Sequence, residues 1–337
     1  MTTKRVSLSV VVTTLIPCMR VSVAWNQVNP IQKIISGRPS QQQQQQQHYG
    51  FPLLVSSSAL FGSFFSGFGS VSSQQPQPLF TQVISDVDDT LKSSGGVQVA
   101  GVALGGIDVQ YNRGEIYPGV AEFMLALSSH PPESVPAKIA ILTARAEEFK
   151  AALEIKDESK LAVALRSAGT AAGIDGWGIG PVLYGSVAEW IIQDRKGLRK
   201  FTNFERLIQQ DPTGTIFQYI YVGDVGELDQ EAGETMLREY PEVVKAVFLH
   251  VVSDREGETP IIPALQFING RPLVFFRTYV GAAVDAVQLG FMDMDGLQSV
   301  IDASIKKLAN VPQSSDKWLD VEKDINRAKL LLSNRRR

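Results

Sequence analysis

Short apolar runs alternate with amphipathic stretches along the chain from residue 80 onward. We expect the runs to form strands; they lie at 81–85, 138–145, 181–186, 217–223, 243–252 and 272–276. Between them, stretches such as 118–129 and 196–210 show the spacing of apolar residues that is typical of helices. Strands separated by helices pair in parallel and are buried on both faces of their sheet. The alternation therefore predicts an α/β fold, with a parallel sheet covered by helices on both faces.

The charges are distributed very unevenly along the chain. The whole sequence has 32 Lys and Arg, 35 Asp and Glu, and a net charge of −3. No acidic residue precedes Asp86, and five cations precede it, so the first 85 residues carry +5 and the rest −8. This division excludes one uniform domain along the whole chain. Because the part with strand and helix patterns is acidic, it also excludes a nucleic-acid binder that works by bulk positive charge.

The first 24 residues have the pattern of a signal sequence. A short basic start precedes an apolar stretch, and small residues suitable for cleavage end at Ala24. Pro17 and Arg20 interrupt the apolar stretch, which is too short for a good transmembrane helix. No integral membrane span is therefore expected in the mature protein.

Residues 25–79 form an acid-free segment rich in Ser and Gln, including a Gln run at 41–47. Such a composition cannot bury a stable core, and we predict a disordered leader. The combination of a signal-like start and a transit-like segment resembles the bipartite leader of proteins bound for complex plastids. The leader predicts a plastid (chloroplast) destination, with secretion and mitochondrial import as alternatives.

The remaining residues divide into a main domain and a short C-terminal part. We assign 80–310 to the domain and 311–337 to a helical or basic tail that ends in three arginines. The arginines are most simply a solvated end, and a peripheral contact with anionic lipid stays open.

Cysteine and histidine are scarce. Cys18 is the single cysteine, which excludes an intrachain disulfide and a zinc site built from cysteines. The histidines are His48, His130 and His250, so a histidine-rich metal site is not expected. Catalysis in this chain would have to rest on carboxylates and lysine.

The first apolar run ends directly in a cluster of acidic residues. Asp86, Asp88 and Asp89 follow residues 81–85, and Thr90 comes next. Asp is a poor strand residue, and α/β sheets place their ligand sites at the carboxyl ends of their strands. The alternative is an ordinary polar turn, because Asp and Thr are common turn residues.

Two later strand ends carry further polar groups. The run at 138–145 ends around Thr143, whose hydroxyl can donate to a phosphate oxygen or simply cap a following helix. The run at 217–223 is followed by Asp224, Glu227 and Asp229. Carboxylates at a strand end suit Mg²⁺, although acids are also favoured at the start of a helix.

Lys200 lies near the start of the predicted helix at 196–210. A cation is unfavourable there because the amino end of a helix is already partly positive. Lys200 is therefore a candidate for neutralising a phosphate, and the alternative is a solvated lysine in a basic cluster.

The order of these groups along the chain resembles a known set of motifs. D-x-D-x-T at 86–90, Thr143, Lys200 and G-D-x-x-x-x-D at 223–229 are similar to the four motifs of the haloacid-dehalogenase superfamily of phosphohydrolases. The resemblance implies a three-layer, Rossmann-like sheet, the fold that the alternation predicts on its own.

A narrower resemblance is to the catalytic domain of the actin-patch type of phosphatidate phosphatase. It is carried by ISDVDDTLK at 84–92, K-x-x-x-F-E-R-L-I at 200–208 and YVGDVGELDQE at 221–231, and it covers residues 80–285. The chain departs from the family at 142–150, where LTARAEEFK replaces a serine-rich segment. This departure puts the contacts to the substrate in doubt.

The resemblance implies specific chemical roles. Asp86 would be the nucleophile that forms an aspartyl-phosphate, and Asp88 the general acid and then the general base. Asp86 and Asp224 would bind Mg²⁺ together with the backbone carbonyl of Asp88. The glycine-rich segment between Thr90 and Tyr117 would be a mobile flap.

The remaining two roles concern the phosphoryl group. Thr143 and Lys200 would hold its oxygens, and Asp229 would orient Lys200 or a metal-bound water. The implied activity is a Mg²⁺-dependent phosphomonoesterase that acts on phosphatidate in lipid metabolism.

Two alternatives remain. One is a phosphatase of a small soluble phosphoester such as a sugar phosphate, since the same four motifs would serve it. The other is a non-enzymatic phospho-acceptor switch, which also uses acids, a Thr and a Lys. A receiver domain of that kind has no acidic pair after its lysine, whereas Asp224 and Asp229 follow Lys200 here.

Overall fold

The computed structural model describes residues 80–99, 102–103, 105–132, 134–146, 156–185, 196–211, 214–226 and 228–334. The predicted leader segments at 1–24 and 25–79 lie outside these residues, as do Glu227, residues 147–150 of the segment at 142–150 and the three terminal arginines. Strands and helices alternate along the described residues, as the sequence predicts.

The strands are β1 (Phe80–Ser85), β2 (Gln98–Val99), β3 (Val102–Ala103), β4 (Val135–Pro136), β5 (Ile139–Ala146), β6 (Ile179–Gly185), β7 (Ile216–Asp224), β8 (Val244–His250), β9 (Gln266–Ile268) and β10 (Arg271–Phe276). The helices are α1 (Val120–Ser128), α3 (Lys160–Ala171), α5 (Lys196–Gln209), α6 (Asp229–Glu239), α7 (Tyr279–Gln288), α8 (Met294–Leu308) and α9 (Asp316–Asn334).

One large sheet organises the fold. Its strand order is β6-β5-β1-β7-β8-β10-β9, with the short β4 beside the start of β1. Every pairing in this sheet is parallel except that of β9 with β10. The predicted parallel sheet is confirmed, with a short antiparallel strand added at one edge. Because β1 lies between β5 and β7, the strand order reverses at β1, which is where such sheets open a crevice at their carboxyl edge.

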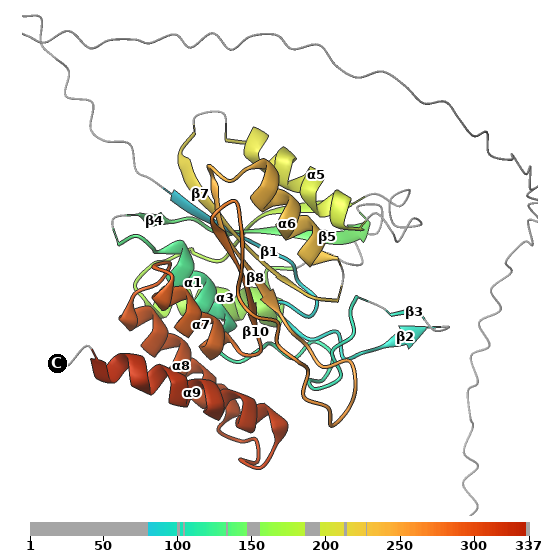
Figure 1. The fold of residues 1–337 in the computed structure, drawn as a ribbon, viewed down its shortest axis with the longest axis vertical. Helices are drawn as coiled ribbons and strands as arrows, with labels where there is room; N and C mark the ends of the chain where they lie inside the picture. The colour runs from blue at the N-terminus through green and yellow to red at the C-terminus, as the bar shows by residue number, and fades with distance from the viewer. Residues whose placement is uncertain are drawn as a thin grey trace, which may run out of the picture. The chain divides into compact units, whose positions relative to one another are not determined.

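Helices cover both faces of the sheet, so the fold has three layers (Figure 1). Helices α5 and α6 lie on one face, and α1, α3, α7 and α8 lie on the other. Neighbouring residues of each strand enter opposite cores: in β1, Val83 packs on the α1–α7 side and Ile84 on the α5–α6 side. The same alternation holds for Phe248 and Leu249 in β8. Burial on both faces explains why these strands read as continuous apolar runs.

Helix α9 packs against the helices on one face of the sheet and adds to the hydrophobic core there. It contacts α7 and α8, and Val321, Ile325 and Ala328 on it are buried in the core of the α1–α7 side. These residues have helical spacing. Leu319 and Leu330 on the same helix are exposed.

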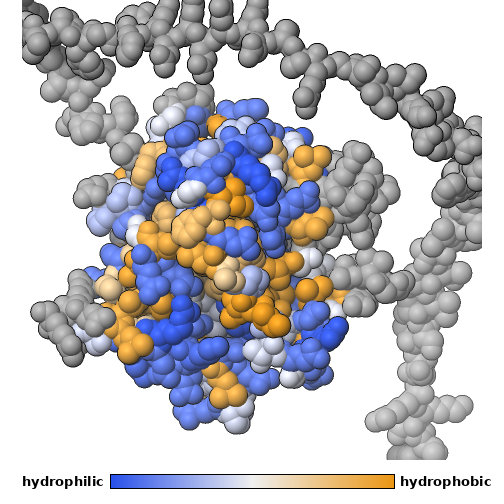
Figure 2. Space-filling view, viewed as in Figure 1, coloured by the Kyte–Doolittle hydropathy of each residue, from blue (hydrophilic) through white to orange (hydrophobic). Residues whose placement is uncertain are grey.

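One face of the molecule carries apolar residues at its surface. In Figure 2 they gather near the middle of the face, over the region of β8 and β10, with hydrophilic residues around them. Large exposed apolar side chains occur between β8 and the end of β9, at Ile261, Ile262, Leu265 and Phe267. Among the described residues, no helix is long and apolar enough to cross a membrane.

Candidate active site

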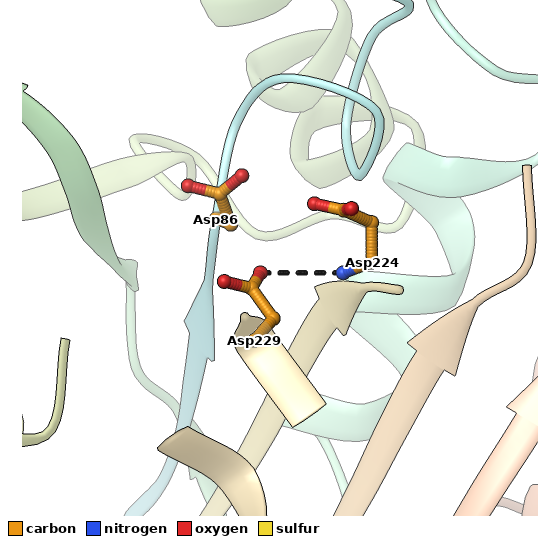
Figure 3. Close-up of side chains that lie close together, drawn as sticks. All are labelled: Asp86, Asp224 and Asp229. Atoms are coloured by element: carbon orange, nitrogen blue, oxygen red, sulfur yellow. Dashed lines mark hydrogen bonds between the residues drawn. The ribbon is translucent and has the colours of Figure 1, made fainter. Parts of the chain in front are cut away.

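Three buried carboxylates meet at the carboxyl edge of the sheet. Asp86 directly follows β1, Asp224 is the last residue of β7, and Asp229 is the first residue of α6. Figure 3 shows their side chains grouped in one place. One oxygen from each lies within 4.8 Å of the others, and all three residues are at most 2 % exposed. The sequence predicted that these three residues belong to one site, and the fold brings them together.

Local backbone geometry fixes the three carboxylates. The N–H of Asp86 donates to the carbonyl of Val222 at 3.1 Å, which extends the pairing of β1 with β7 by one residue. The N–H of Asp224 donates to Asp229 Oδ2 at 3.2 Å (Figure 3). A Cβ at Gly223 would lie 2.5 Å from this same oxygen, so glycine alone fits there. Asp229 also begins a helix, where a negative charge is favoured.

Lys200 provides the positive charge of the cluster. It lies on α5 and is completely buried. Its Nζ is 3.1 Å from Asp86 Oδ1, and it also forms an ion pair with Asp229 Oδ1. Burying an ammonium group in this way is tolerated only when opposite charges and hydrogen-bond acceptors surround it. Lys200 is therefore a fixed member of the site and not a solvated surface lysine.

The charges of these four groups do not balance. Three carboxylates and one ammonium group leave a net charge of −2 in a buried place. Buried charge is costly unless it is compensated, and carboxylate oxygens are the ligands that hard divalent cations prefer. The donor set of Asp86, Asp224 and Asp229 therefore fits Mg²⁺.

Asp88 is less buried than these three carboxylates. Its side chain is 17 % exposed, and its Oδ1 is 3.6 Å from Lys92 Nζ. Partial exposure leaves Asp88 more accessible than the buried carboxylates, as a group that exchanges protons with a substrate or water must be.

Thr143 is buried within β5, the strand beside β1. It follows by two residues Ile141, which pairs with Ser85 of β1. This register places Thr143 beside the chain that follows β1, at the same edge of the sheet as the carboxylates. All six residues predicted for the site therefore lie at one edge.

His250 was not singled out by any sequence pattern, but it contacts the acidic loop that follows β1. It is the last residue of β8 and is buried. Its Nδ1 is 2.8 Å from the carbonyl oxygen of Asp89, and its Nε2 is 3.1 Å from that of Arg277. Burial lowers the pKa of His250 to about 4, so the ring is neutral at pH 7 and donates to one of the two carbonyls.

The lowered pKa makes a pH-dependent contribution to stability. Between pH 6.5 and about 4 the unfolded chain binds a proton at His250 that the folded chain does not bind. Above pH 6.5 the ring is neutral in both states and His250 does not lower the stability of the fold. As the pH falls from 6.5 towards 4, proton binding by the unfolded chain lowers the free energy of unfolding. We expect the free energy of unfolding of the wild type to fall by about 3 kcal/mol more than that of His250→Asn between pH 7 and pH 4. Urea unfolding at both pH values measures it, and parallel decreases in the two proteins would contradict it.

Comparisons with known proteins leave the family of the chain open. No family model matches the sequence, and no curated protein matches it. Among solved structures, a protein from Mesorhizobium loti described as a HAD-like phosphatase is similar with a TM-score of 0.33 and 13% sequence identity. The match covers 66% of this chain and 87% of that one. Similarity at this level identifies neither a family nor a reaction.

Proposed function

We propose that the chain is a Mg²⁺-dependent phosphomonoesterase that works through an aspartyl-phosphate. The observation that carries the proposal is the buried arrangement of Asp86, Lys200, Asp224 and Asp229. An accessible carboxylate, Asp88, lies two residues after the proposed nucleophile. Phosphoryl transfer requires a nucleophile, a nearby proton donor, and positive charge that neutralises the phosphoryl oxygens.

In the first step, an oxygen of Asp86 attacks phosphorus. A bond forms between that oxygen and phosphorus while the bond to the leaving alkoxide breaks. Asp88 transfers its proton to the leaving oxygen, so the product departs as a neutral alcohol.

In the second step, Asp88, now a carboxylate, takes a proton from water as that water attacks the same phosphorus. The phosphorus–Asp86 bond breaks, inorganic phosphate is released, and both aspartates return to their starting states.

Electrostatics explain why the cluster contains more than a nucleophile. Two unit negative charges about 4 Å apart repel by about 4 kcal/mol at an effective dielectric constant near 20. Lys200, held at 3.1 Å from Asp86, opposes that repulsion as a phosphate approaches. Bound Mg²⁺ would neutralise further negative charge on the phosphoryl oxygens. Thr143 would donate a hydrogen bond to one of those oxygens.

Phosphatidate is the substrate that we propose for this site. The motif resemblance supports it, and so do the exposed Ile261, Leu265 and Phe267. Their segment begins at the carboxyl end of β8, and its Ser253 carbonyl accepts from the N–H of Val109 at 2.8 Å, at the end of the glycine-rich loop. Exposed apolar side chains suit a peripheral contact with a lipid surface, on which a substrate with acyl chains would be bound. A sugar phosphate is the alternative.

Phosphate release from a substrate panel tests the proposal. The panel contains phosphatidate in mixed micelles, glucose 6-phosphate and p-nitrophenyl phosphate, each assayed with MgCl₂ and with EDTA. We expect activity that needs Mg²⁺ and is highest on phosphatidate. We also expect Asp224→Asn to raise the Mg²⁺ concentration at half-maximal rate by about tenfold or more.

Each outcome of the panel has a clear reading. Full activity in EDTA would overturn the metal assignment, and a preference for glucose 6-phosphate would overturn the lipid substrate alone. Stable phosphorylation of Asp86 without phosphate release would favour the phospho-acceptor switch.

A further inference from the structure

We propose that Asp89 is a positioning residue whose carboxylate ties both ends of the glycine-rich loop at 94–108 and thereby holds Asp88 in place. Asp89 occupies the variable position of the D-x-D-x-T motif, between Asp88 and Thr90, so the motif implies no role for it. The catalytic meaning of this inference rests on the proposed function. The structural part, that Asp89 closes the loop, stands independently of any activity.

Three backbone N–H groups converge on the Asp89 carboxylate. The N–H of Ser94 donates to Oδ1 at 2.7 Å. The N–H groups of Ile107 and Asp108 donate to Oδ2 at 2.6 and 2.9 Å. One donor comes from the start of the loop and two from its end, so a single buried side chain closes the loop at its base. Hydrogen bonds from N–H groups to a carboxylate are among the stronger ones in proteins.

The backbone of Asp89 is itself held from two sides. Its N–H donates to the carbonyl of Lys92 at 2.7 Å, and His250 Nδ1 lies 2.8 Å from its carbonyl oxygen. Asp89 is completely buried and has a φ of 59°, a left-handed conformation in which glycine would be easier to accommodate. Since the carboxylate is the group that three donors contact, it explains why an aspartate occupies a position that suits glycine.

The end of the loop that Asp89 holds lies against the proposed catalytic groups. A Cβ at Gly105 would lie 3.1 Å from Asp88 Oδ2, so the loop backbone passes directly beside that carboxylate. A Cβ at Gly106 would lie 2.1 Å from Asp89 Oδ2, which glycine alone avoids. Ile107 and Asp224 both lie beside Gly226: a Cβ at Gly226 would be 3.2 Å from Ile107 Cγ1 and 2.9 Å from Asp224 Oδ1.

These contacts connect the base of the loop to proton transfer. When Asp89 holds residues 105–107 in place, the backbone at Gly105 limits where the Asp88 carboxylate can go. Asp88 must point at the leaving oxygen as the oxygen–phosphorus bond breaks, because its proton moves to that oxygen. Without the Asp89 carboxylate, the backbone at Gly105 would no longer be held beside Asp88, and the Asp88 carboxylate would be less restricted.

The test uses Asp89→Gly in the full-length protein. Glycine accepts the left-handed backbone and removes only the carboxylate. We compare kcat/KM for p-nitrophenyl phosphate with kcat/KM for the alkyl phosphate of the panel that the wild type hydrolyses fastest. Nitrophenolate leaves without a proton, whereas an alkoxide needs one. We expect about a 100-fold loss on the alkyl phosphate and less than about a fivefold loss on the aryl phosphate.

Two comparisons make this result specific. Asp88→Asn should show the same selective loss, because it removes the proton donor itself. Asn269→Gly is the matched control: Asn269 also has a left-handed backbone, with a φ of 49°, in the turn between β9 and β10. It should leave both rates unchanged. Equal losses on both substrates in Asp89→Gly would show a merely structural role and overturn the positioning role.

Hydrogen exchange tests the loop closure without any substrate. In Asp89→Gly, and also in Asp89→Asn if the glycine variant does not fold, the amides of Ser94, Ile107 and Asp108 should exchange at least about tenfold faster than in the wild type. An asparagine cannot accept on both sides, so it loses at least one of the three donors. Unchanged exchange in these amides would overturn the closure. A wild type that is inactive on every phosphoester would overturn the proposed function but leave this measurement decisive for Asp89.

Discussion

We expect Asp86→Asn to abolish phosphate release, with a loss in kcat of at least about 10⁴-fold, or about 5.5 kcal/mol of activation free energy. The amide has nearly the shape of the carboxylate but cannot form the aspartyl-phosphate. The fold should remain, because Lys200 keeps its second partner, Asp229. Steady-state assays on the preferred substrate, together with circular dichroism, measure both parts of the expectation.

Asp254→Asn is the control for the Asp86 variant. Asp254 is exposed and lies in the segment that follows β8, at the same edge of the sheet. Its replacement should leave kcat within about twofold of the wild type, since exposed substitutions away from the site change little. Undiminished turnover in Asp86→Asn protein would remove Asp86 as the nucleophile and with it the proposed mechanism.

Much of the site was readable in the sequence because it depends on strand ends. In a parallel sheet, the residues that follow each strand meet at one edge. Asp86 and Asp224 follow apolar runs that are buried on both faces, so once the strands are identified their meeting is expected. Lys200 stood out for a different reason, since its charge disagrees with its place near the start of a helix.

The supporting groups could not be predicted, because their partners are remote in the chain or depend on loop conformation. His250 contacts Asp89 across 161 residues, and nothing in the local sequence around His250 indicates that contact. Asp89 reaches Ile107 through a backbone turn with a positive φ, which sequence patterns do not specify for aspartate. The buried face of α9 could not be predicted either, because Leu319 and Leu330 are exposed while the small Ala328 is buried.

We expect Lys200→Met to lower the free energy of unfolding by about 3–5 kcal/mol at pH 7. Methionine is unbranched like lysine, although one atom shorter, and it removes the charge that Asp86 and Asp229 share in a fully buried place. Two buried carboxylates then face each other without their ammonium partner. Phosphatase activity should be lost as well, because Lys200 also opposes the repulsion between Asp86 and the incoming phosphate. Urea unfolding at pH 7 measures the first effect and the substrate panel the second.

The source of the Lys200 effect can be isolated with a second substitution. Lys200→Met combined with Asp229→Asn removes one of the two stranded carboxylates, so the double variant should be more stable than Lys200→Met alone. Lys307→Met, at an exposed position on α8, should change stability by no more than about 0.5 kcal/mol. A double variant that is less stable than Lys200→Met, although Asp229→Asn alone costs little, would mean that Lys200 contributes through packing and not through charge. The ammonium group would then be dispensable for the fold, and its burial between two aspartates would have to be explained by catalysis alone.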